Sequence, residues 1–184
     1  MVVGSDNPNG AENQQERLRQ EGWVIGFVDG EGCFSVSFVR QNDRGKRRGY
    51  KLGYQVSPRF TVAQGASSVA CLEELREFFG VGCVYGNQRH DNHREHMKQY
   101  VVSDRWDLME SIVPFFEEHP LRSAKRNDFD KFVRVLRMIE DGLHLTCEGL
   151  AQIAEIAETM NRRKPRTDLI RILRGHTPNI QDTG

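Results

Sequence analysis

The sequence predicts an α+β fold whose αββαββα core forms a four-stranded antiparallel sheet, with extra helices at the C-terminus. Two stretches, 33–38 and 50–64, alternate apolar and polar residues, which is typical of strands with one buried face. A second strand pair, 83–88 and 98–103, follows the turn at 80–82. Helical apolar stripes lie before, between and after these pairs. The 184 residues can bury one core, so we expect one domain.

We expect residues 1–12, rich in Gly, Asn and Pro, to be a disordered tail, residues 13–175 to form the domain, and 176–184 to be a second tail. The first helix is predicted from about Asn13 to Gly30. Gly26 and Gly30 are four residues apart, so they share a helix face that a second helix could approach closely. Glu31 follows at the helix end, where carbonyls lack partners, and hard oxygen ligands of this kind suit Mg²⁺ or Ca²⁺.

The strand predicted over 50–64 has the clearest pattern. One face is apolar, whereas the other carries Gln55, Ser57, Arg59 and Thr61 and no acid. Gln and Arg can make bidentate contacts with base edges, so we favour a nucleic-acid surface over a merely solvated one. The loop at 41–49 is rich in arginine and lysine. A phosphate contact and a solvated hairpin tip remain equally open for it.

The remaining helices are predicted at 67–79, 104–114, 146–161 and 167–173. Residues 120–129 are predicted to lead into a longer helix that reaches about Glu140. The hairpin tip at 89–96 holds three histidines, for which we favour contact with backbone phosphates over metal binding. The cysteines show no CxxC spacing, so a zinc or disulfide framework is not expected. No apolar run is long enough to span a membrane, and no targeting signal is seen. We expect a cytoplasmic protein without a membrane partner, and synthesis in an organelle stays open.

The formal net charge is zero, yet the charges are unevenly distributed. Residues 33–64 carry seven basic side chains and one acid, whereas residues 1–32 carry six acids and two bases. A protein binds phosphates with a local basic face, so the distribution is compatible with nucleic-acid binding.

The segment Val24–Gly32 resembles the signature of the LAGLIDADG homing endonucleases, with Gly26, Asp29 and Gly32 in register and Glu31 at the position of the metal-binding acid. The resemblance extends to the 50–64 strand, the 80–82 turn, the 120–129 segment and residues 145–161. It implies a saddle-shaped sheet that binds double-stranded DNA in the major groove.

The resemblance also implies site-specific cleavage of both strands of a pseudo-palindromic site by Mg²⁺-dependent hydrolysis, with Ca²⁺ binding without supporting cleavage. Glu31 and the backbone of Gly32 would hold the metal, Gln64 would orient water, and Lys125 would stabilise charge at the scissile phosphate. Asp29 is expected to stabilise helix packing rather than bind metal. The sequence has one signature only, which in this family implies a homodimer, with Gly26, Phe27 and Gly30 at its interface.

Candidate DNA-binding residues lie on the polar strand faces and in the loops between strands. They are Ser35, Ser37, Gln41, Arg44, Lys46, Arg47, Arg48, Tyr50, Gln55, Ser57, Arg59, Thr61, Tyr85, Asn87, Arg89 and Gln99. The alternative is a non-cleaving protein on the same scaffold, either an intron maturase that binds intron RNA or a repressor. A metalloenzyme that does not act on nucleic acid would leave the acid-free strand face unexplained.

Overall fold

The computed structural model describes residues 8–41, 52–87, 96–161 and 165–175. It confirms the predicted fold class, with both strand pairs joined in one antiparallel sheet and helices around it. The strands are β1 (Gly32–Arg40), β2 (Tyr54–Gly65), β3 (Cys83–Asn87) and β4 (Met97–Val102). The helices are α1 (Pro8–Glu31), α2 (Val69–Phe79), α3 (Arg105–Asp107), α4 (Val113–Glu118), α5 (Lys125–Glu140), α6 (Cys147–Glu158) and α7 (Thr167–Gly175).

The sheet has the order β1-β2-β4-β3, so each hairpin contributes one central strand and one edge strand. Gly32 pairs with Val62 at the start of β1, and Phe60 pairs with Val102 of β4. Pro58 has no N–H to donate, and it lies where β2 has β1 as its neighbour but has not yet reached the β4 pairing. β2 therefore tolerates a proline within its length.

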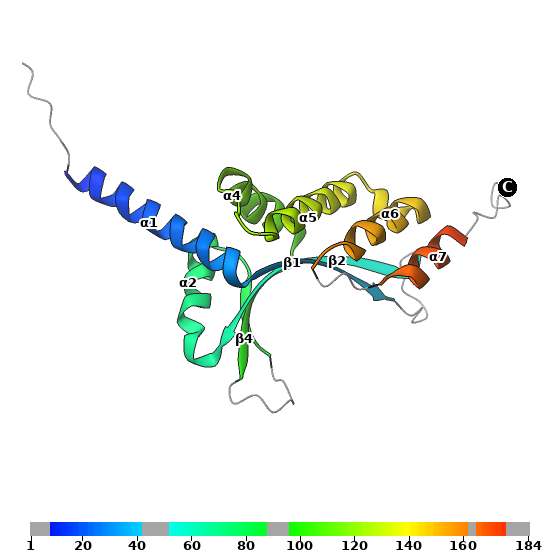
Figure 1. The fold of residues 1–184 in the computed structure, drawn as a ribbon, viewed down its shortest axis with the longest axis horizontal. Helices are drawn as coiled ribbons and strands as arrows, with labels where there is room; N and C mark the ends of the chain where they lie inside the picture. The colour runs from blue at the N-terminus through cyan, green and yellow to red at the C-terminus, as the bar shows by residue number, and fades with distance from the viewer. Residues whose placement is uncertain (1–7, 42–51, 88–95, 162–164, 176–184) are drawn as a thin grey trace, which may run out of the picture.

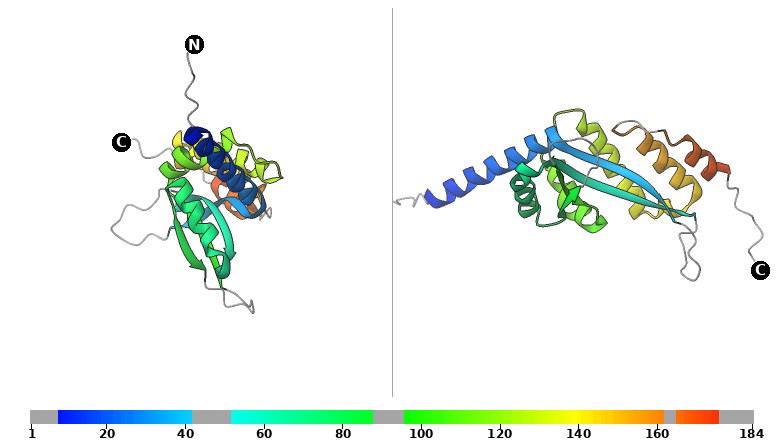
Figure 2. Two further views of the ribbon diagram at one scale, coloured as in Figure 1. Left: turned by 90° about the vertical axis from the view of Figure 1, so that its left-hand side faces the viewer. Right: turned by 90° about the horizontal axis from the view of Figure 1, so that it is seen from below.

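The helices lie on the convex side of the curved sheet. In Figure 1, α4, α5 and α6 lie above the ribbon formed by β1 and β2, and α2 lies beside β4. The concave side, below the ribbon in that view, is free of helices in the described part of the chain. Figure 2 shows that the N-terminal half of α1 extends away from the sheet. One face of the sheet is thus packed and the other is open.

The core is built around the aromatic side chains of the packed sheet face. Phe34 stacks on Phe60 at 5.0 Å between ring centroids and makes edge contacts with Phe116 and Phe129. Both Phe34 and Phe60 are almost completely buried, as the alternation predicted. A second, smaller apolar cluster joins Leu150 of α6 and Leu173 of α7 to the far end of the β1–β2 ribbon. The C-terminal helices therefore support the part of the ribbon farthest from α1.

Two helix boundaries differ from the prediction. α1 begins at Pro8 rather than near Asn13, so residues 8–12 belong to the helix. Proline is tolerated in the first turn of a helix, where its missing N–H has no partner anyway. The helix predicted to end near Pro114 continues to Glu118. A wider π-helical turn, Leu108–Ile112, comes directly before Pro114, and α4 then has this proline in its own first turn.

Several predictions lie outside the described residues. They concern the first seven residues of the N-terminal tail, most of the 41–49 loop, the start of the 50–64 strand, most of the histidine-rich tip and the C-terminal tail. None of the described helices combines the length and the apolar character that crossing a membrane requires.

Candidate active site and nucleic-acid interface

The C-terminal end of α1 is tied to the segment before α5 by Asp29. Its carboxylate accepts hydrogen bonds from the backbone N–H groups of Arg122 and Ser123, each at 3.0 Å. Burial by itself would raise the pKa of Asp29, but the hydrogen bonds from Ser123 and Arg122 and the charge of Lys125 lower it overall. These contacts are those of a residue that fixes the chain, in agreement with the structural role expected for Asp29.

Lys125, the first residue of α5, contacts the same helix end. Its Nζ donates to the carbonyl oxygens of Asp29 at 2.8 Å and Gly30 at 2.5 Å. The expectation that these carbonyls are without partners is therefore wrong, because a lysine ammonium occupies them. The neighbouring Arg126 instead lines a pocket on the helical side, so the structure brings Lys125 rather than Arg126 to the end of α1.

Glu31 is exposed at the point where α1 turns into β1. This turn requires Gly32: a Cβ atom there would lie 2.6 Å from Val28 Cγ1 and 2.7 Å from the Val28 carbonyl oxygen. Real Cβ contacts are essentially never this short, so the helix can pass directly into the strand only with glycine at this position. The backbone of Glu31 is thereby fixed at this corner of the sheet, and its side chain is exposed there.

Gln64 lies at the same corner. Val62 pairs with Gly32, so Gln64, two residues further along β2, extends beyond the start of β1 to the level of the α1 end. Alternation places Gln64 on the face of Phe60 and Val62, opposite to Arg59 and Thr61. Glu31, Gln64 and Lys125, which are distant in the sequence, are thus brought to one end of the sheet. Their predicted roles in catalysis stay predictions.

The open sheet face carries the polar residues predicted for β1 and β2. Arg59 and Ser37 are exposed, and Ser35, Gln55, Ser57 and Thr61 are partly exposed. Tyr85 of β3 is also exposed, and Gln99 of β4 pairs with Tyr85 on the same side. The exposure of Asn87 lies outside what the structure describes. The side chain of Gln41 donates to Gln55 at 2.9 Å, which links the end of β1 to this face. Arg44, Lys46, Arg47, Arg48, Tyr50 and Arg89 lie outside the described residues.

The helix face around Gly26 and Gly30 is open. Both glycines are exposed, and a Cβ atom added to either would meet no atom within 4 Å. Phe27, the third residue predicted for a dimer interface, is partly buried and stacks on Trp23 with ring centroids 5.2 Å apart. The single chain therefore leaves space beside its two glycines for close approach of another helix.

The donor set near Glu31 suits a magnesium ion shared with substrate. Among the described residues, no group of three or more His, Cys, Asp or Glu side chains could hold a metal ion alone. One chain thus offers Glu31 and backbone oxygen such as that of Gly32. Mg²⁺ in nuclease-type sites is commonly bound by one or two carboxylates plus phosphate oxygens and water. The exposed Glu31 carboxylate fits one position of that coordination mode.

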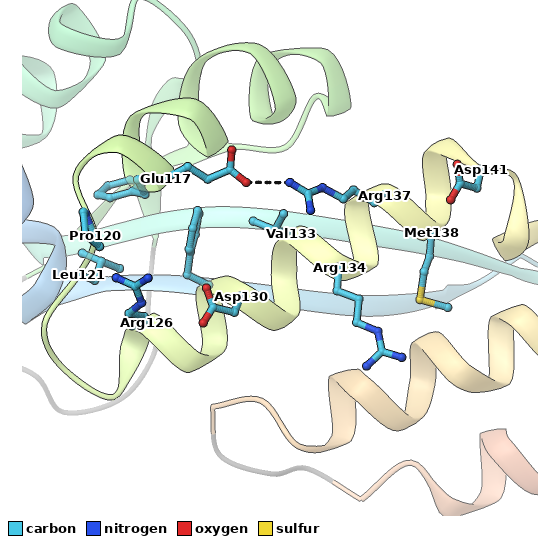
Figure 3. A pocket seen from close by; sticks show the side chains of 12 residues that line it. Glu117, Pro120, Leu121, Arg126, Asp130, Val133, Arg134, Arg137, Met138 and Asp141 are labelled. Atoms are coloured by element: carbon cyan, nitrogen blue, oxygen red, sulfur yellow. Dashed lines mark hydrogen bonds and ion pairs between the residues drawn. The ribbon is translucent and has the colours of Figure 1, made fainter.

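A separate pocket of about 420 Å³ lies on the helical side, between α4 and α5 (Figure 3). Three arginines and three acids line it, and Arg137 pairs with Glu117 at 2.8 Å. These charges balance, so the pocket lacks the net basic character that phosphate binding requires.

Residues that support the interface include two that the sequence interpretation missed. Asn161 donates from its amide nitrogen to the Phe34 carbonyl at 2.7 Å, and Arg166 donates to the Val36 carbonyl at 2.8 Å. Arg166 also lies 5.0 Å from the Phe38 ring centroid. Together they cover the outer edge of β1, which protects it from pairing with other strands. No local pattern marks them, because both contacts span more than 120 residues.

The structure thus combines an open four-stranded sheet, an exposed acid at the helix–sheet junction and an uncovered glycine face on the preceding helix. This combination is compatible with an endonuclease that binds nucleic acid on its sheet. The chain belongs to the LAGLIDADG endonuclease family, whose family model matches residues 24–136.

Named relatives agree with this assignment. A "Probable intron-encoded endonuclease 2" of Neurospora crassa is 28% identical over 140 residues, which is 75% of this chain but only 26% of that protein. The chain therefore spans about a quarter of this curated relative.

Among solved structures, the homing endonuclease I-TnaI is 42% identical with a TM-score of 0.69, and the match covers 84% of this chain and 96% of that one. I-SmaMI bound to cleaved DNA is 28% identical with a TM-score of 0.71, over 86% of this chain and 49% of that one. I-SmaMI has also been solved on uncleaved target DNA in the presence of calcium ions.

Proposed function

We propose that this protein is a site-specific homing endonuclease that binds a long pseudo-palindromic DNA site as a homodimer and hydrolyses both strands with Mg²⁺. The observation that carries the proposal is the corner at the end of α1. There an exposed Glu31 stands between an open, acid-free sheet face and a glycine face that no part of the described chain covers. Family membership and the DNA complexes of I-SmaMI support double-stranded DNA as the substrate.

The homodimer is proposed because two strands are cut and each chain has one Glu31. Cutting two strands calls for two active sites, and a two-fold axis supplies them from one sequence. One copy of this chain corresponds to 49% of the I-SmaMI chain, which is the share that one half of such a pair would provide. Packing Gly26 and Gly30 of two copies together would bring both Glu31 side chains near the axis.

Each residue at the corner has a proposed role. Bound Mg²⁺ would activate a water molecule and stabilise the leaving oxygen. Glu31 supplies the carboxylate for this ion, and Gln64 orients the attacking water. Lys125, already fixed on the carbonyls of Asp29 and Gly30, places a positive charge where the scissile phosphate develops negative charge. Ca²⁺ is proposed to occupy the site without supporting cleavage, in line with the uncleaved I-SmaMI complex.

The test is incubation of the purified protein with Mg²⁺ and DNA that spans the uninterrupted insertion site of its own gene. We expect two cuts, one in each strand, within the site. Replacing Mg²⁺ with Ca²⁺ should keep binding and stop cleavage. Specific binding without any cut in Mg²⁺ would instead favour the maturase or repressor alternative, and intron RNA would then be the next ligand to test.

A further inference from the structure

One row of the open sheet face consists of small or aliphatic side chains without amide or charged groups, and it lies next to the corner at Glu31. The strand register aligns Cys33, Thr61, Val101 and Cys83 across all four strands. Directly paired residues point to the same side of a sheet, so Val101 and Cys83 share the face of Thr61. Val101 is partly exposed, while its neighbours Tyr100 and Val102 are completely buried on the other side.

The rows on either side carry hydrogen-bonding side chains, although the one toward the hairpin tip also contains Ala63, which pairs with Gln99. Ser35 pairs with Arg59 one step further from the corner, and Gln99 pairs with Tyr85 one step toward the hairpin tip. Val101 is therefore a branched aliphatic side chain between an arginine and a glutamine on a face proposed to meet DNA. It cannot make the hydrogen bonds with base edges that its neighbours can make.

In the major groove, the apolar feature of a base pair is the C5-methyl group of thymine, which apolar side chains contact directly. We propose that Val101, flanked by the methyl group of Thr61 and the side chain of Cys83, recognises a C5-methylated pyrimidine, thymine in unmodified DNA, in each half-site. The row begins at Cys33, two residues after Glu31, so the recognised base pair lies near the cleavage position. This inference rests on the proposed function.

The test begins with selection of bound sites from a random double-stranded DNA library. We expect a T·A pair at two symmetry-related positions near the cut. Replacing those thymines with deoxyuridine removes only the methyl group and should weaken binding about fourfold per position. This factor corresponds to roughly 0.8 kcal/mol, the transfer free energy of one buried CH₂ group. Cytosine there should bind weakly, and 5-methylcytosine should recover part of the affinity.

Two variants assign the effect to Val101. Val101→Ala should bring the affinity ratio of thymine to deoxyuridine close to unity. Val101→Thr keeps the shape and exchanges one methyl for a hydroxyl, so it should reduce the same ratio even if the alanine variant folds poorly. Val39→Ala is the matched control: it makes the same change at an exposed valine of β1 that is not among the candidate DNA-binding residues, and it should leave the ratio unchanged.

The outcomes separate the two proposals. The recognition of thymine is contradicted if thymine and deoxyuridine bind equally at every position, or if both Val101 variants keep the affinity ratio of the unaltered protein. Val101 would then only favour the strand conformation, and the proposal of site-specific cleavage would stand. If no site is enriched and no DNA is cut, the proposed function fails, and recognition of thymine fails with it.

Discussion

At the scale of single residues, Glu31 is the one acid at the corner whose carboxylate is exposed and engaged in no described hydrogen bond or ion pair. Glu31→Gln keeps the size of the side chain and removes the charge that a metal ion needs. We expect cleavage to be abolished and specific binding to be retained, because the sheet face is untouched. Gel-shift and cleavage assays on the same target measure both, and unchanged cleavage at saturating Mg²⁺ would contradict the assignment of Glu31.

Asp29, two residues earlier, is expected to act on stability. Its pKa in the folded chain is below the ordinary 3.8, so its stabilising contribution is complete above 3.8 and is lost as the pH falls through the lowered value. Asp29→Asn should reduce the free energy of unfolding at neutral pH and flatten its dependence on pH in the acid range.

Chemical denaturation of both proteins at several pH values tests the role of Asp29, with Asp168→Asn, which changes an exposed acid in α7, as a matched control. If the Asp29→Asn protein loses stability on acidification as steeply as the unaltered protein does, the hydrogen bonds from Arg122 and Ser123 do not contribute as described.

At the scale of elements, the alternation in β2 separates two proposed kinds of DNA contact. Arg59 is exposed and lies on the same strand face as Ser57 and Thr61. Arg59→Ala should therefore lower the binding free energy by about 1–3 kcal/mol through one base pair per half-site, and it should relax the base preference at that position. Arg47 lies outside the described residues. We expect it in the loop between β1 and β2, in contact with phosphates rather than base edges. Arg47→Ala should weaken binding to all DNA sequences alike. It should also reduce the slope of the logarithm of the binding constant against the logarithm of the salt concentration by about one unit.

Affinities for a panel of single-base variants of the target, at several salt concentrations, distinguish the two arginines. A uniform loss for Arg59→Ala together with a changed base preference for Arg47→Ala would reverse the assignment of the strand and the loop.

The glycine face of α1 allows a sharp test of association. Because an added side chain at Gly30 meets no atom of its own chain within 4 Å, Gly30→Leu should leave the single chain folded. In a close helix pair the same side chain overpacks the contact, which typically costs about 1–3 kcal/mol. Analytical ultracentrifugation over a concentration series should show weaker dimerisation, with circular dichroism as the control for folding. Undiminished association would place the interface elsewhere.

How far the elements could be predicted depends on whether their signal is local. The alternation around Phe34 and Phe60 was sufficient to identify the strands and their buried faces, and the glycines marked the end of α1. The passage of the helix through Pro114 was not predictable, because it depends on the π-helical turn before it. The contact of Lys125 with the carbonyls of Asp29 and Gly30 was missed because it joins segments about 95 residues apart.

At the scale of the whole molecule, one chain provides half of what the proposed reaction needs. It contributes one exposed carboxylate at the corner, one open and acid-free sheet face, and one glycine face without a partner in the described chain. The sequence predicted each of these pieces, but their convergence at one end of the sheet follows from the β1–β2 register and from the segment that Asp29 holds in place.

The most direct test of the central claim is cleavage by a mixed dimer. Co-expression of two differently tagged chains, one unaltered and one carrying Glu31→Gln, allows the mixed species to be purified through both tags. If each copy supplies one essential carboxylate, the mixed dimer should bind the target as tightly as the unaltered dimer but should no longer cut both strands. Double-strand cleavage by the mixed dimer at the rate of the unaltered protein would contradict the account.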